Sequence, residues 1–445
     1  MAREGKSCRK CSHSVTGARN SGPTGRAATF RDSMMMLRSL FASLFLALAG
    51  CTTATAVTAP QTIAATQREP VTILVSIDGF RPEYLRRGDS PNLDALAATG
   101  VTAEMRPSFP TKTFPNHYTI VTGLRPDRHG IVDNNMEDAA RPGERFSMGN
   151  ASQALDPFWW DGGEPIWVTA EKQGVRTATM FWPGSEVAVR GTRPADWQRF
   201  DLNITNPQRV RAVVDWLRRP QASRPQFVTL YFDTVDTAGH RYGPQAPETR
   251  AAIREVDSRI GELGAGLDAL GQPVNFVITS DHGMAATSAE RVIRADRLLD
   301  PAAFRTISDG AFLSLDPLPG REEEVAAALL RPHPHMQCWR KGDLPERFAY
   351  GTHPRVPAIF CLAETGWLIL ASEPRYSPDG GTHGYDNLDP AMKALFIASG
   401  PAFRSGVTLP IFDNVAVYPL LAEVLGVVPQ PSDGQAETLA PALRD

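Results

Sequence analysis

Short, uninterrupted apolar runs rich in β-branched residues punctuate the chain. A run of roughly 4–8 such residues without a polar break is typical of a strand that is buried on both faces, as in a parallel sheet. We therefore predict strands over residues 71–77, 226–232 and 274–280, with two further strands over 176–180 and 394–399.

Segments with helical periodicity separate these runs. Apolar residues recur at helical spacing over 206–217, 246–270 and 415–425. A further helix is predicted to begin at Pro91, with Ser90 as its N-cap. Strands that alternate with helices predict an α/β fold with a doubly wound, mostly parallel central sheet.

The first part of the chain has the organisation of an export signal. Residues 1–33 are polar and basic, and we expect them to be a non-native or disordered extension, with translation starting at one of Met34–Met36. Residues 34–51 combine a charged start, a short apolar run and the ending Leu-Ala-Gly-Cys, which predicts a signal peptide with a lipobox. Cys51 would then be the lipidated first residue, and plain secretion is the alternative. We expect an exported bacterial protein that is periplasmic or anchored in the outer membrane.

The rest of the chain is expected to form one folded domain. Residues 52–70, rich in Thr, Ala and Gln, predict a flexible tether before it. The domain itself is predicted over 71–430, with a C-terminal tail over 431–445. Within the domain, residues 300–380 are rich in proline and less regular, which predicts an inserted subdomain or hairpins at a sheet edge.

Composition and charge restrict the partners. The chain has 445 residues, of which 42% are hydrophobic and 21% charged, with a net charge of −3, which is ordinary for a globular α/β protein. Because there is no basic excess, duplex nucleic acid is excluded as the main partner. Beyond Cys51 the only cysteines are Cys338 and Cys361. In an exported chain such a pair favours a disulfide, and two free buried thiols are the alternative.

The segment Pro110–Tyr118 contains two prolines, two threonines and a lysine. Proline fixes φ and restrains the residue before it, so the segment predicts a rigid turn, with a short helix from Tyr118 to Gly123. A hydroxyl held at such a junction is well placed to be a nucleophile if another group lowers its pKa. Thr111 and Thr113 both qualify, and the alternative is a turn that only caps the helix.

Three aspartates and three histidines occur in short loop contexts, mostly next to glycine and after predicted strands. Alone, each could be a cap or turn residue. Together they form the carboxylate and imidazole set that zinc binds, with Mn²⁺ or Co²⁺ as alternatives. Six protein ligands suit two ions, the usual device for in-line displacement at phosphorus, and an ion could activate a threonine hydroxyl. These candidate ligands are Asp78, Asp236, His240, Asp281, His282 and His383.

Eight short motifs follow one another along the domain. They are residues 78–82, 109–118, 122–132, 163–170, 181–185, 236–240, 281–284 and 383–387. In these motifs the chain resembles the nucleotide pyrophosphatase/phosphodiesterase family, the type I phosphodiesterases of the alkaline phosphatase superfamily, as a bacterial single-domain member. The resemblance implies that residues 71–430 form the catalytic domain, with a fold of the alkaline phosphatase type.

The resemblance also implies two Zn²⁺ ions and a covalent mechanism. Thr113 would be the nucleophile and form a nucleotidyl-threonine, which water then hydrolyses to release a nucleoside 5′-monophosphate. The first ion would be held by Asp78, Thr113, Asp281 and His282, and the second by Asp236, His240 and His383.

Three residues are implied to bind the nucleotide substrate. Asn134, rather than Asn135, corresponds to the amide that donates to a phosphoryl oxygen beside the backbone N–H at the nucleophile. A neutral amide there, instead of an arginine, favours a singly charged phosphodiester over a monoester. Phe114 and Tyr231 resemble the aromatic pair that stacks on the nucleobase, with ordinary core packing as the alternative.

The remaining residues of the motifs are expected to be structural. We predict that His117 and His129 cap or pack, that Lys112 orients its loop, and that Asp233 pairs with a basic group. The alternatives to a nucleotide phosphodiesterase are a lysophospholipid phosphodiesterase of the same fold and a surface binding protein without catalysis. The oligomeric state and the physiological substrate stay open.

Overall fold

The computed structural model describes residues 68–375 and 377–444. The chain divides into two units, Met1–Ala64 and Ala65–Asp445, and all described residues belong to the second unit. The predicted extension, the signal peptide and most of the tether therefore lie outside the described residues and stay predictions. Within the described residues, no helix is both long and apolar enough to cross a membrane.

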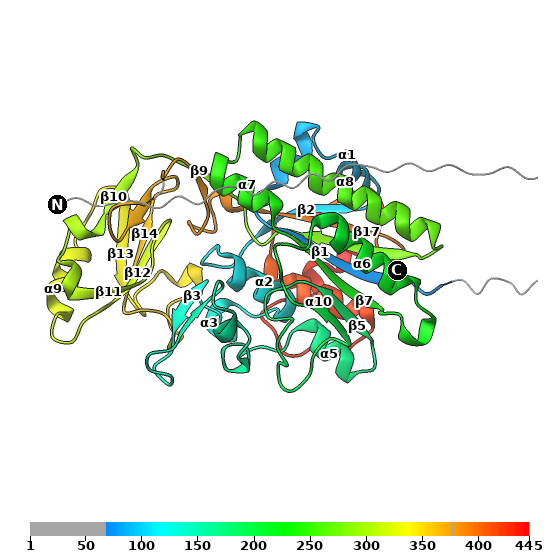
Figure 1. The fold of residues 1–445 in the computed structure, drawn as a ribbon, viewed down its shortest axis with the longest axis horizontal. Helices are drawn as coiled ribbons and strands as arrows, with labels where there is room; N and C mark the ends of the chain where they lie inside the picture. The colour runs from blue at the N-terminus through cyan, green and yellow to red at the C-terminus, as the bar shows by residue number, and fades with distance from the viewer. Residues whose placement is uncertain (1–67, 376, 445) are drawn as a thin grey trace, which may run out of the picture. The chain divides into compact units, whose positions relative to one another are not determined.

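A nine-stranded sheet forms the centre of the fold, in the order β18-β2-β17-β8-β1-β7-β5-β6, with β19 also paired to β2 (Figure 1). Strands β8, β1, β7, β5 and β6 run parallel, whereas β17 is antiparallel to both of its neighbours. The sheet is therefore mostly parallel, as predicted. Its strands are β1 (Val71–Ile77), β2 (Val101–Arg106), β5 (Thr177–Met180), β6 (Asp196–Gln198), β7 (Phe227–Phe232), β8 (Val274–Thr279), β17 (Ala394–Ser399), β18 (Val407–Thr408) and β19 (Phe412–Asp413).

The apolar runs predict five of these strands correctly, namely β1, β5, β7, β8 and β17, to within one residue at each end. The apolar runs do not predict strand β2, because its residues alternate between buried and half-buried positions. Thr102 and Glu104 occupy two of the half-buried positions, so no continuous apolar run marks the strand.

Helices cover both faces of the sheet, so it is doubly wound as predicted. Alternate residues of β1 belong to different hydrophobic clusters: Ile73 and Val75 to one, and Leu74 to the other. Figure 1 shows α8 on one side of β1 and α5 on the other. The first cluster includes residues of α1 (Pro91–Thr99), α6 (Asn206–Arg218) and α8 (Pro247–Ala269), and the second includes residues of α2 (Thr113–Thr122), α5 (Ile166–Lys172) and α10 (Val417–Leu425).

The inserted region has its own antiparallel sheet, in the order β11-β12-β14-β13, and its own hydrophobic cluster. It is thus more regular than its proline content suggests. Cys338 and Cys361 lie opposite each other in register and form the predicted disulfide. The elements of this region are β11 (Phe304–Ser308), β12 (Phe312–Pro317), α9 (Glu322–Leu329), β13 (Met336–Arg340) and β14 (Ile359–Ala363).

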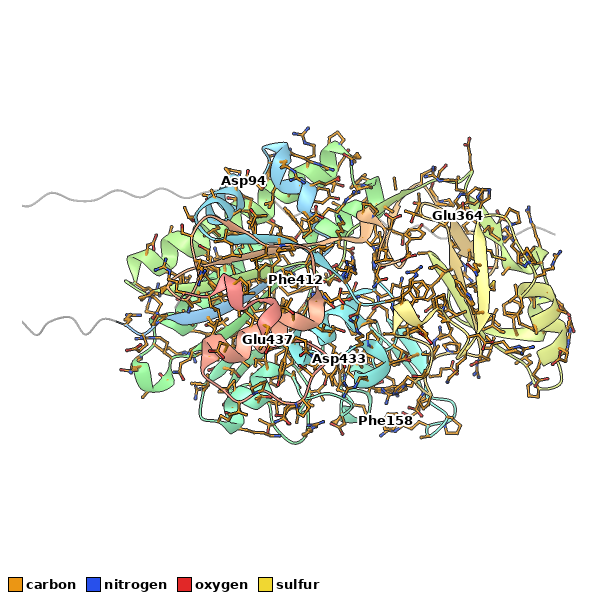
Figure 2. All side chains as sticks on the ribbon, turned by 180° about the vertical axis from the view of Figure 1, so that it is seen from behind. Asp94, Phe158, Glu364, Phe412, Asp433 and Glu437 are labelled. Carbon is orange, nitrogen blue, oxygen red and sulfur yellow. A yellow bond between two sulfur atoms is a disulfide. The ribbon has the colours of Figure 1, made fainter. Side chains whose placement is uncertain are left out.

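Short ribbons and single-turn helices complete the described part. After α10 the chain returns to the start of α3 (Pro126–His129). There Asp433 (Figure 2) accepts a hydrogen bond of 2.8 Å from the Arg125 N–H and forms an ion pair with Arg128. The short elements are β3 (Asn135–Glu137) with β4 (Arg145–Ser147), β9 (Ala285–Thr287) with β16 (Gly380–Thr382), β10 (Val292–Arg294) with β15 (Leu368–Leu370), α3 (Pro126–His129) and α4 (Ala151–Ala154).

The cap of α1 comes from another helix. Ser90 stands at the N-cap position of α1, as predicted, but its side chain makes no capping hydrogen bond. Instead, Asp257 of α8 accepts from the Leu93 N–H at 2.8 Å and from the Asn92 N–H at 3.2 Å. Asp257 is buried, so one carboxylate both satisfies the first turn of α1 and fastens it to α8.

Replacing Asp257 by alanine should lower the free energy of unfolding by about 1–3 kcal/mol, because two N–H groups in the first turn of α1, one buried and one half-buried, lose their acceptor. Urea unfolding followed by circular dichroism measures this change. The matched control is Asp268→Ala, an exposed position of the same helix. Equal losses in the two variants would contradict the capping role.

Candidate active site

The candidate ligands come together where three neighbouring strands end. Strands β8, β1 and β7 are adjacent and parallel, so their carboxyl ends meet at one edge of the sheet. Asp78 follows β1 and Asp281 follows β8. Helix α7 (Thr234–Tyr242) follows β7 and presents Asp236 and His240, which lie one turn apart on the same face.

Gly79 allows this close assembly. Its φ of +69° is in the left-handed region, and a Cβ at this position would lie 3.1 Å from the Cα and Cβ of Asp236. A larger residue would be strained and would push α7 away from the end of β1. The Asp-Gly sequence after β1 therefore reflects packing as well as chemistry.

Thr113 is the first residue of α2, so the helix begins earlier than the predicted start at Tyr118. The predicted rigid turn is wrong in its second half. Pro115 stands at the third helical position, where a backbone N–H has no acceptor within the helix, so the helix tolerates it. The candidate nucleophile thus lies at a helix N-terminus, where the helix dipole favours an anion.

The structure brings the first predicted ligand group together. The Oγ1 of Thr113 lies 3.2 Å from the Nε2 of His282. The same Nε2 lies 2.8 Å from Oδ2 of Asp281 and 3.5 Å from Oδ1 of Asp78. All four side chains are buried.

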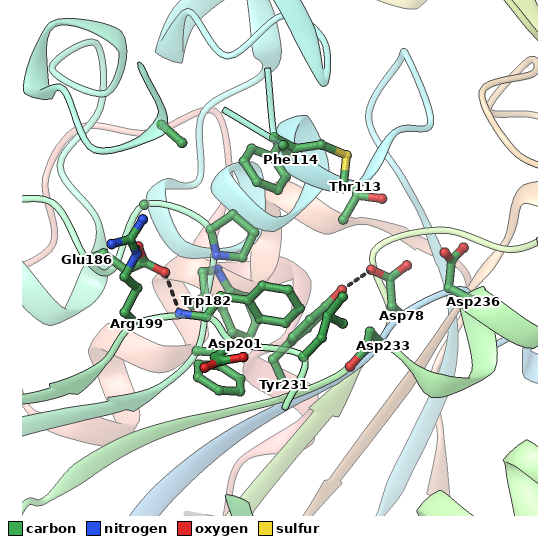
Figure 3. A pocket seen from close by; sticks show the side chains of 18 of the residues that line it. Asp78, Thr113, Phe114, Trp182, Glu186, Arg199, Asp201, Tyr231, Asp233 and Asp236 are labelled. Atoms are coloured by element: carbon green, nitrogen blue, oxygen red, sulfur yellow. Dashed lines mark hydrogen bonds and ion pairs between the residues drawn. The ribbon is translucent and has the colours of Figure 1, made fainter. Parts of the chain in front are cut away.

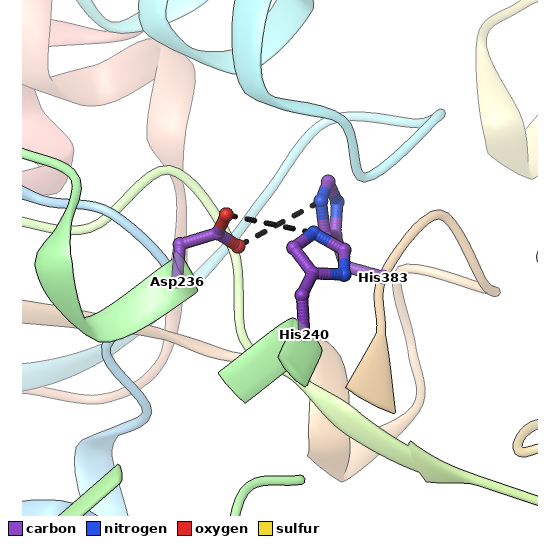
Figure 4. Close-up of side chains that lie close together, drawn as sticks. All are labelled: Asp236, His240 and His383. Atoms are coloured by element: carbon purple, nitrogen blue, oxygen red, sulfur yellow. Dashed lines mark ion pairs between the residues drawn. The ribbon is translucent and has the colours of Figure 1, made fainter. Parts of the chain in front are cut away.

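The second predicted group is also assembled (Figure 4). Oδ2 of Asp236 lies 3.5 Å from Nε2 of His240, and its Oδ1 lies 3.8 Å from Nε2 of His383. The ring of His383 stacks on that of His282, with 3.5 Å between the ring centroids, so the two groups adjoin. One candidate ligand atom each from Asp78, Asp236 and His282 lies within 4.8 Å of the others.

Backbone carbonyls fix the three imidazole rings in one orientation. Nδ1 of His282 lies 2.9 Å from the Gly283 carbonyl, and that of His240 lies 2.9 Å from the Gly381 carbonyl. Nδ1 of His383 lies 2.8 Å from the carbonyl of Thr111. Since a carbonyl only accepts, each Nδ1 carries the proton and each Nε2 turns a lone pair toward the aspartates.

The carboxylates have oxygens without partners. Among the described residues, the buried Oδ1 atoms of Asp78 and Asp236 and the Oδ2 of Asp281 have no hydrogen-bond partner. Nε2 of His282 faces that Oδ2 at 2.8 Å, and two acceptors at this distance need a cation or a proton between them. The residues present therefore fit divalent metal ions.

The electrostatics of the cluster support the same conclusion. Burial, followed by the repulsion from Asp281 and Asp236, raises the pKa of Asp78 well above its usual value. Burial and the charge of Asp236 raise the pKa of Asp281 to about 8. Burial lowers the pKa of His282 and of His383, which keeps both imidazoles neutral and able to bind metal. Bound cations would hold the aspartates ionised.

His117 lies close enough to Asp78 and Asp281 to form a third candidate group, but both of its nitrogens are occupied. Nδ1 donates to the Thr113 carbonyl at 2.8 Å, and Nε2 accepts from Oγ of Ser76 at 2.8 Å. Burial lowers its pKa to about 3, so the ring is neutral. The geometry agrees with the predicted structural role, in which His117 ties the start of α2 to β1.

Asn134 lies against the start of α2. Its Oδ1 accepts from the Phe114 N–H at 2.9 Å, which leaves its Nδ2 free of any hydrogen bond to a described residue. The Thr113 N–H likewise donates to no described acceptor. The available donors beside the candidate nucleophile are thus the Asn134 amide and the Thr113 N–H, since the N–H of Phe114 is occupied.

A pocket of about 610 Å³ opens beside Thr113 (Figure 3). Phe114 and Tyr231, the predicted aromatic pair, both line it. The Tyr231 hydroxyl also donates to Oδ2 of Asp78 at 2.7 Å, a contact that the sequence does not indicate. Tyr231 therefore forms part of the pocket wall and also orients Asp78, a candidate metal ligand.

The pocket has further lining residues that the sequence analysis missed. Trp182 lies within the motif 181–185 but was not assigned to the pocket, and no pattern marks Phe200. Glu186 accepts from the Phe200 N–H at 2.7 Å and lies 3.9 Å from the guanidinium of Arg199.

Asp233 pairs with Arg209 at 2.7 Å, which confirms the prediction that it pairs with a basic group.

Known proteins are similar to this chain in sequence and structure. The family model for type I phosphodiesterase/nucleotide pyrophosphatase matches residues 72–386. An uncharacterized pyrophosphatase/phosphodiesterase of Schizosaccharomyces pombe is 40% identical over 401 residues, which cover 84% of this chain and 80% of that protein. A bis(5′-adenosyl)-triphosphatase of Xenopus laevis is 38% identical over 369 residues, covering 82% and 80%.

A solved structure extends the likeness to the fold. It is an inactive variant of murine ectonucleotide pyrophosphatase/phosphodiesterase 5 in complex with AMP. The TM-score is 0.81 at 32% identity, and the match covers 84% of this chain and 100% of that chain. Together with the strand order, this confirms a fold of the alkaline phosphatase type.

Replacing Tyr231 by phenylalanine should lower the affinity for Zn²⁺ by about tenfold, because Asp78 loses the donor that orients its carboxylate. The ring is kept, so the pocket wall changes little. Competition with a chromophoric chelator measures the affinity. The control is Tyr350→Phe, another buried tyrosine, which donates to the Val132 carbonyl. An unchanged Zn²⁺ affinity in the Tyr231 variant would refute the orienting role.

Proposed function

Because the chain belongs to the type I phosphodiesterase/nucleotide pyrophosphatase family, we propose that it is a two-zinc hydrolase of nucleotide phosphodiester and pyrophosphate bonds. Its product would be a nucleoside 5′-monophosphate. One observation carries this proposal: Oγ1 of Thr113 lies 3.2 Å from His282 inside the cluster of aspartates and histidines, at the mouth of a pocket lined by Phe114 and Tyr231.

Two zinc ions fit the two groups of ligands. When bound, zinc would supply Lewis acidity that lowers the pKa of a hydroxyl and neutralises charge on the reacting phosphoryl group. Partnerless carboxylate oxygens and the common orientation of the imidazoles support this assignment. The first ion would be held by Asp78, Thr113, Asp281 and His282, and the second by Asp236, His240 and His383.

Thr113 would act as the nucleophile. Its oxygen attacks phosphorus and forms a covalent nucleotidyl-threonine, which water then hydrolyses. The Thr113 N–H and the Asn134 amide would donate to phosphoryl oxygens as negative charge grows there. One well-placed donor of this kind contributes roughly 3–4 kcal/mol to the transition state. Asn134 is neutral, which suits the single charge of a phosphodiester.

The nucleoside would occupy the pocket beside Thr113. Phe114 and Tyr231 offer ring faces for base stacking, worth about 1–3 kcal/mol per base and tolerant of base identity. The relative whose structure holds AMP supports a nucleotide as the occupant. Exposed apolar side chains, Met148 and Leu202, also line the pocket, and they keep a lysophospholipid as the second candidate substrate.

We further propose that the protein is exported and that Cys51 carries a lipid, so that its only membrane contact is through this anchor. The signal-like residues 34–51 motivate this proposal. Cell fractionation of the Cys51→Ala variant should show the protein released into the soluble periplasmic fraction. An intact mass of the wild-type protein that shows no lipid on Cys51 would exclude lipidation as the anchor.

Thr113→Ala should reduce kcat/KM for the p-nitrophenyl ester of TMP and for ATP by about a thousandfold or more, because the nucleophilic oxygen is gone. Thr113→Ser, which keeps a hydroxyl, is the matched control and should retain measurable turnover. Lysophosphatidylcholine tested beside ATP separates the two candidate substrates. Near wild-type hydrolysis by Thr113→Ala would rule out the covalent mechanism.

A further inference from the structure

A second cavity adjoins the candidate metal site. It has a volume of about 520 Å³ and shares only Asp236 and Thr237 with the pocket beside Thr113. Asp236 therefore stands between the two cavities. The other lining residues of the second cavity are His240, Arg241, Ser377 and Asp379.

The chemistry of in-line displacement assigns different parts of the substrate to the two cavities. The attacking and leaving oxygens lie on opposite sides of phosphorus. Thr113 lines the first pocket and contacts His282, whereas Asp236 and His240 of the other ligand group line the second cavity. With the nucleoside in the first pocket, the leaving group points into the second.

Arg241 is the one cationic side chain among the described residues that line this second cavity. It belongs to the last turn of α7, next to His240, and is exposed. It forms no ion pair with a described residue, and its guanidinium lies 5.1 Å from the centroid of the Tyr242 ring. A guanidinium with free donors at this place suits a phosphate group.

The nearby acid does not neutralise Arg241. Asp379 lines the same cavity, but its Oδ1 accepts from the Ala289 N–H at 2.9 Å and its Oδ2 from the Ser377 hydroxyl at 3.0 Å. These hydrogen bonds hold the carboxylate between its own loop and the turn that contains Ala289. The positive charge of Arg241 therefore stays available to a ligand.

We propose that Arg241 determines specificity for the leaving group: it binds the phosphate of a phosphoanhydride substrate and makes a phosphate or pyrophosphate a better leaving group than a neutral or aromatic alcohol. This inference rests on the proposed function. In the step concerned, the bond from phosphorus to Oγ1 of Thr113 forms, and the bond to the bridging oxygen breaks. Its electron pair leaves with the pyrophosphate, and the hydroxyl proton passes to water.

The test compares two substrates that share the adenosine 5′-monophosphoryl group but differ in leaving group, ATP and the p-nitrophenyl ester of AMP. Arg241→Gln should lower kcat/KM for ATP by about tenfold, the effect of losing one charge-assisted hydrogen bond at a partly solvated site. It should change kcat/KM for the ester by less than about twofold, because nitrophenolate carries no phosphate. Arg241→Lys should recover part of the activity on ATP, and Arg241→Glu should lose more.

The control is Arg86→Gln, which replaces an exposed arginine that lines neither cavity. This variant should leave kcat/KM for both substrates unchanged. Equal losses on ATP and the ester, or no loss on ATP, would overturn the role of Arg241. Failure of the wild-type protein to hydrolyse either substrate would instead overturn the proposed function, and this inference with it. The two failures are thus distinguishable.

Discussion

The repulsion among carboxylates at the carboxyl edge of the sheet is the constraint on which the rest of the structure depends. Asp78 and Asp281 are fully buried, and Asp236 lies beside them, so their charged forms require compensation. Among the described residues, no lysine or arginine forms an ion pair with them. Instead, three imidazoles face the aspartates, and a backbone carbonyl fixes the Nδ1 of each ring. This arrangement leaves each Nε2 free to bind a cation, and it does not itself neutralise the carboxylates.

The same edge of the sheet also determines where the candidate nucleophile stands. His117 connects Ser76, the penultimate residue of β1, to the carbonyl of Thr113. The start of α2 is therefore held against the strand that supplies Asp78. Rigid attachment of this kind matters because a misplacement of the reacting oxygen by about 1 Å can lower the rate by about a hundredfold.

The sequence predicts the parts of the fold that depend on local composition. Strands such as β1 and β8 are continuous apolar runs, and the six candidate ligands lie in motifs whose chemistry is explicit. The features that it does not predict depend on distant parts of the chain. Asp257 caps α1 from another helix, and Phe200 reaches the pocket from a segment without a pattern. The early start of α2 was missed because Pro115 suggests a turn, although the first turn of a helix needs no N–H donors.

Tyr231 connects the binding of a nucleobase in the pocket to the binding of a metal ion by Asp78. Its ring is part of the wall that a nucleobase would contact, and its hydroxyl holds the carboxylate of Asp78. Any displacement of this side chain by a base is transmitted to the carboxylate, and any reorientation of the carboxylate by an ion is transmitted to the ring. Reciprocity then requires that occupancy of one site changes the affinity of the other by the same factor. The strength of base binding and of metal binding therefore cannot be tuned independently through this residue.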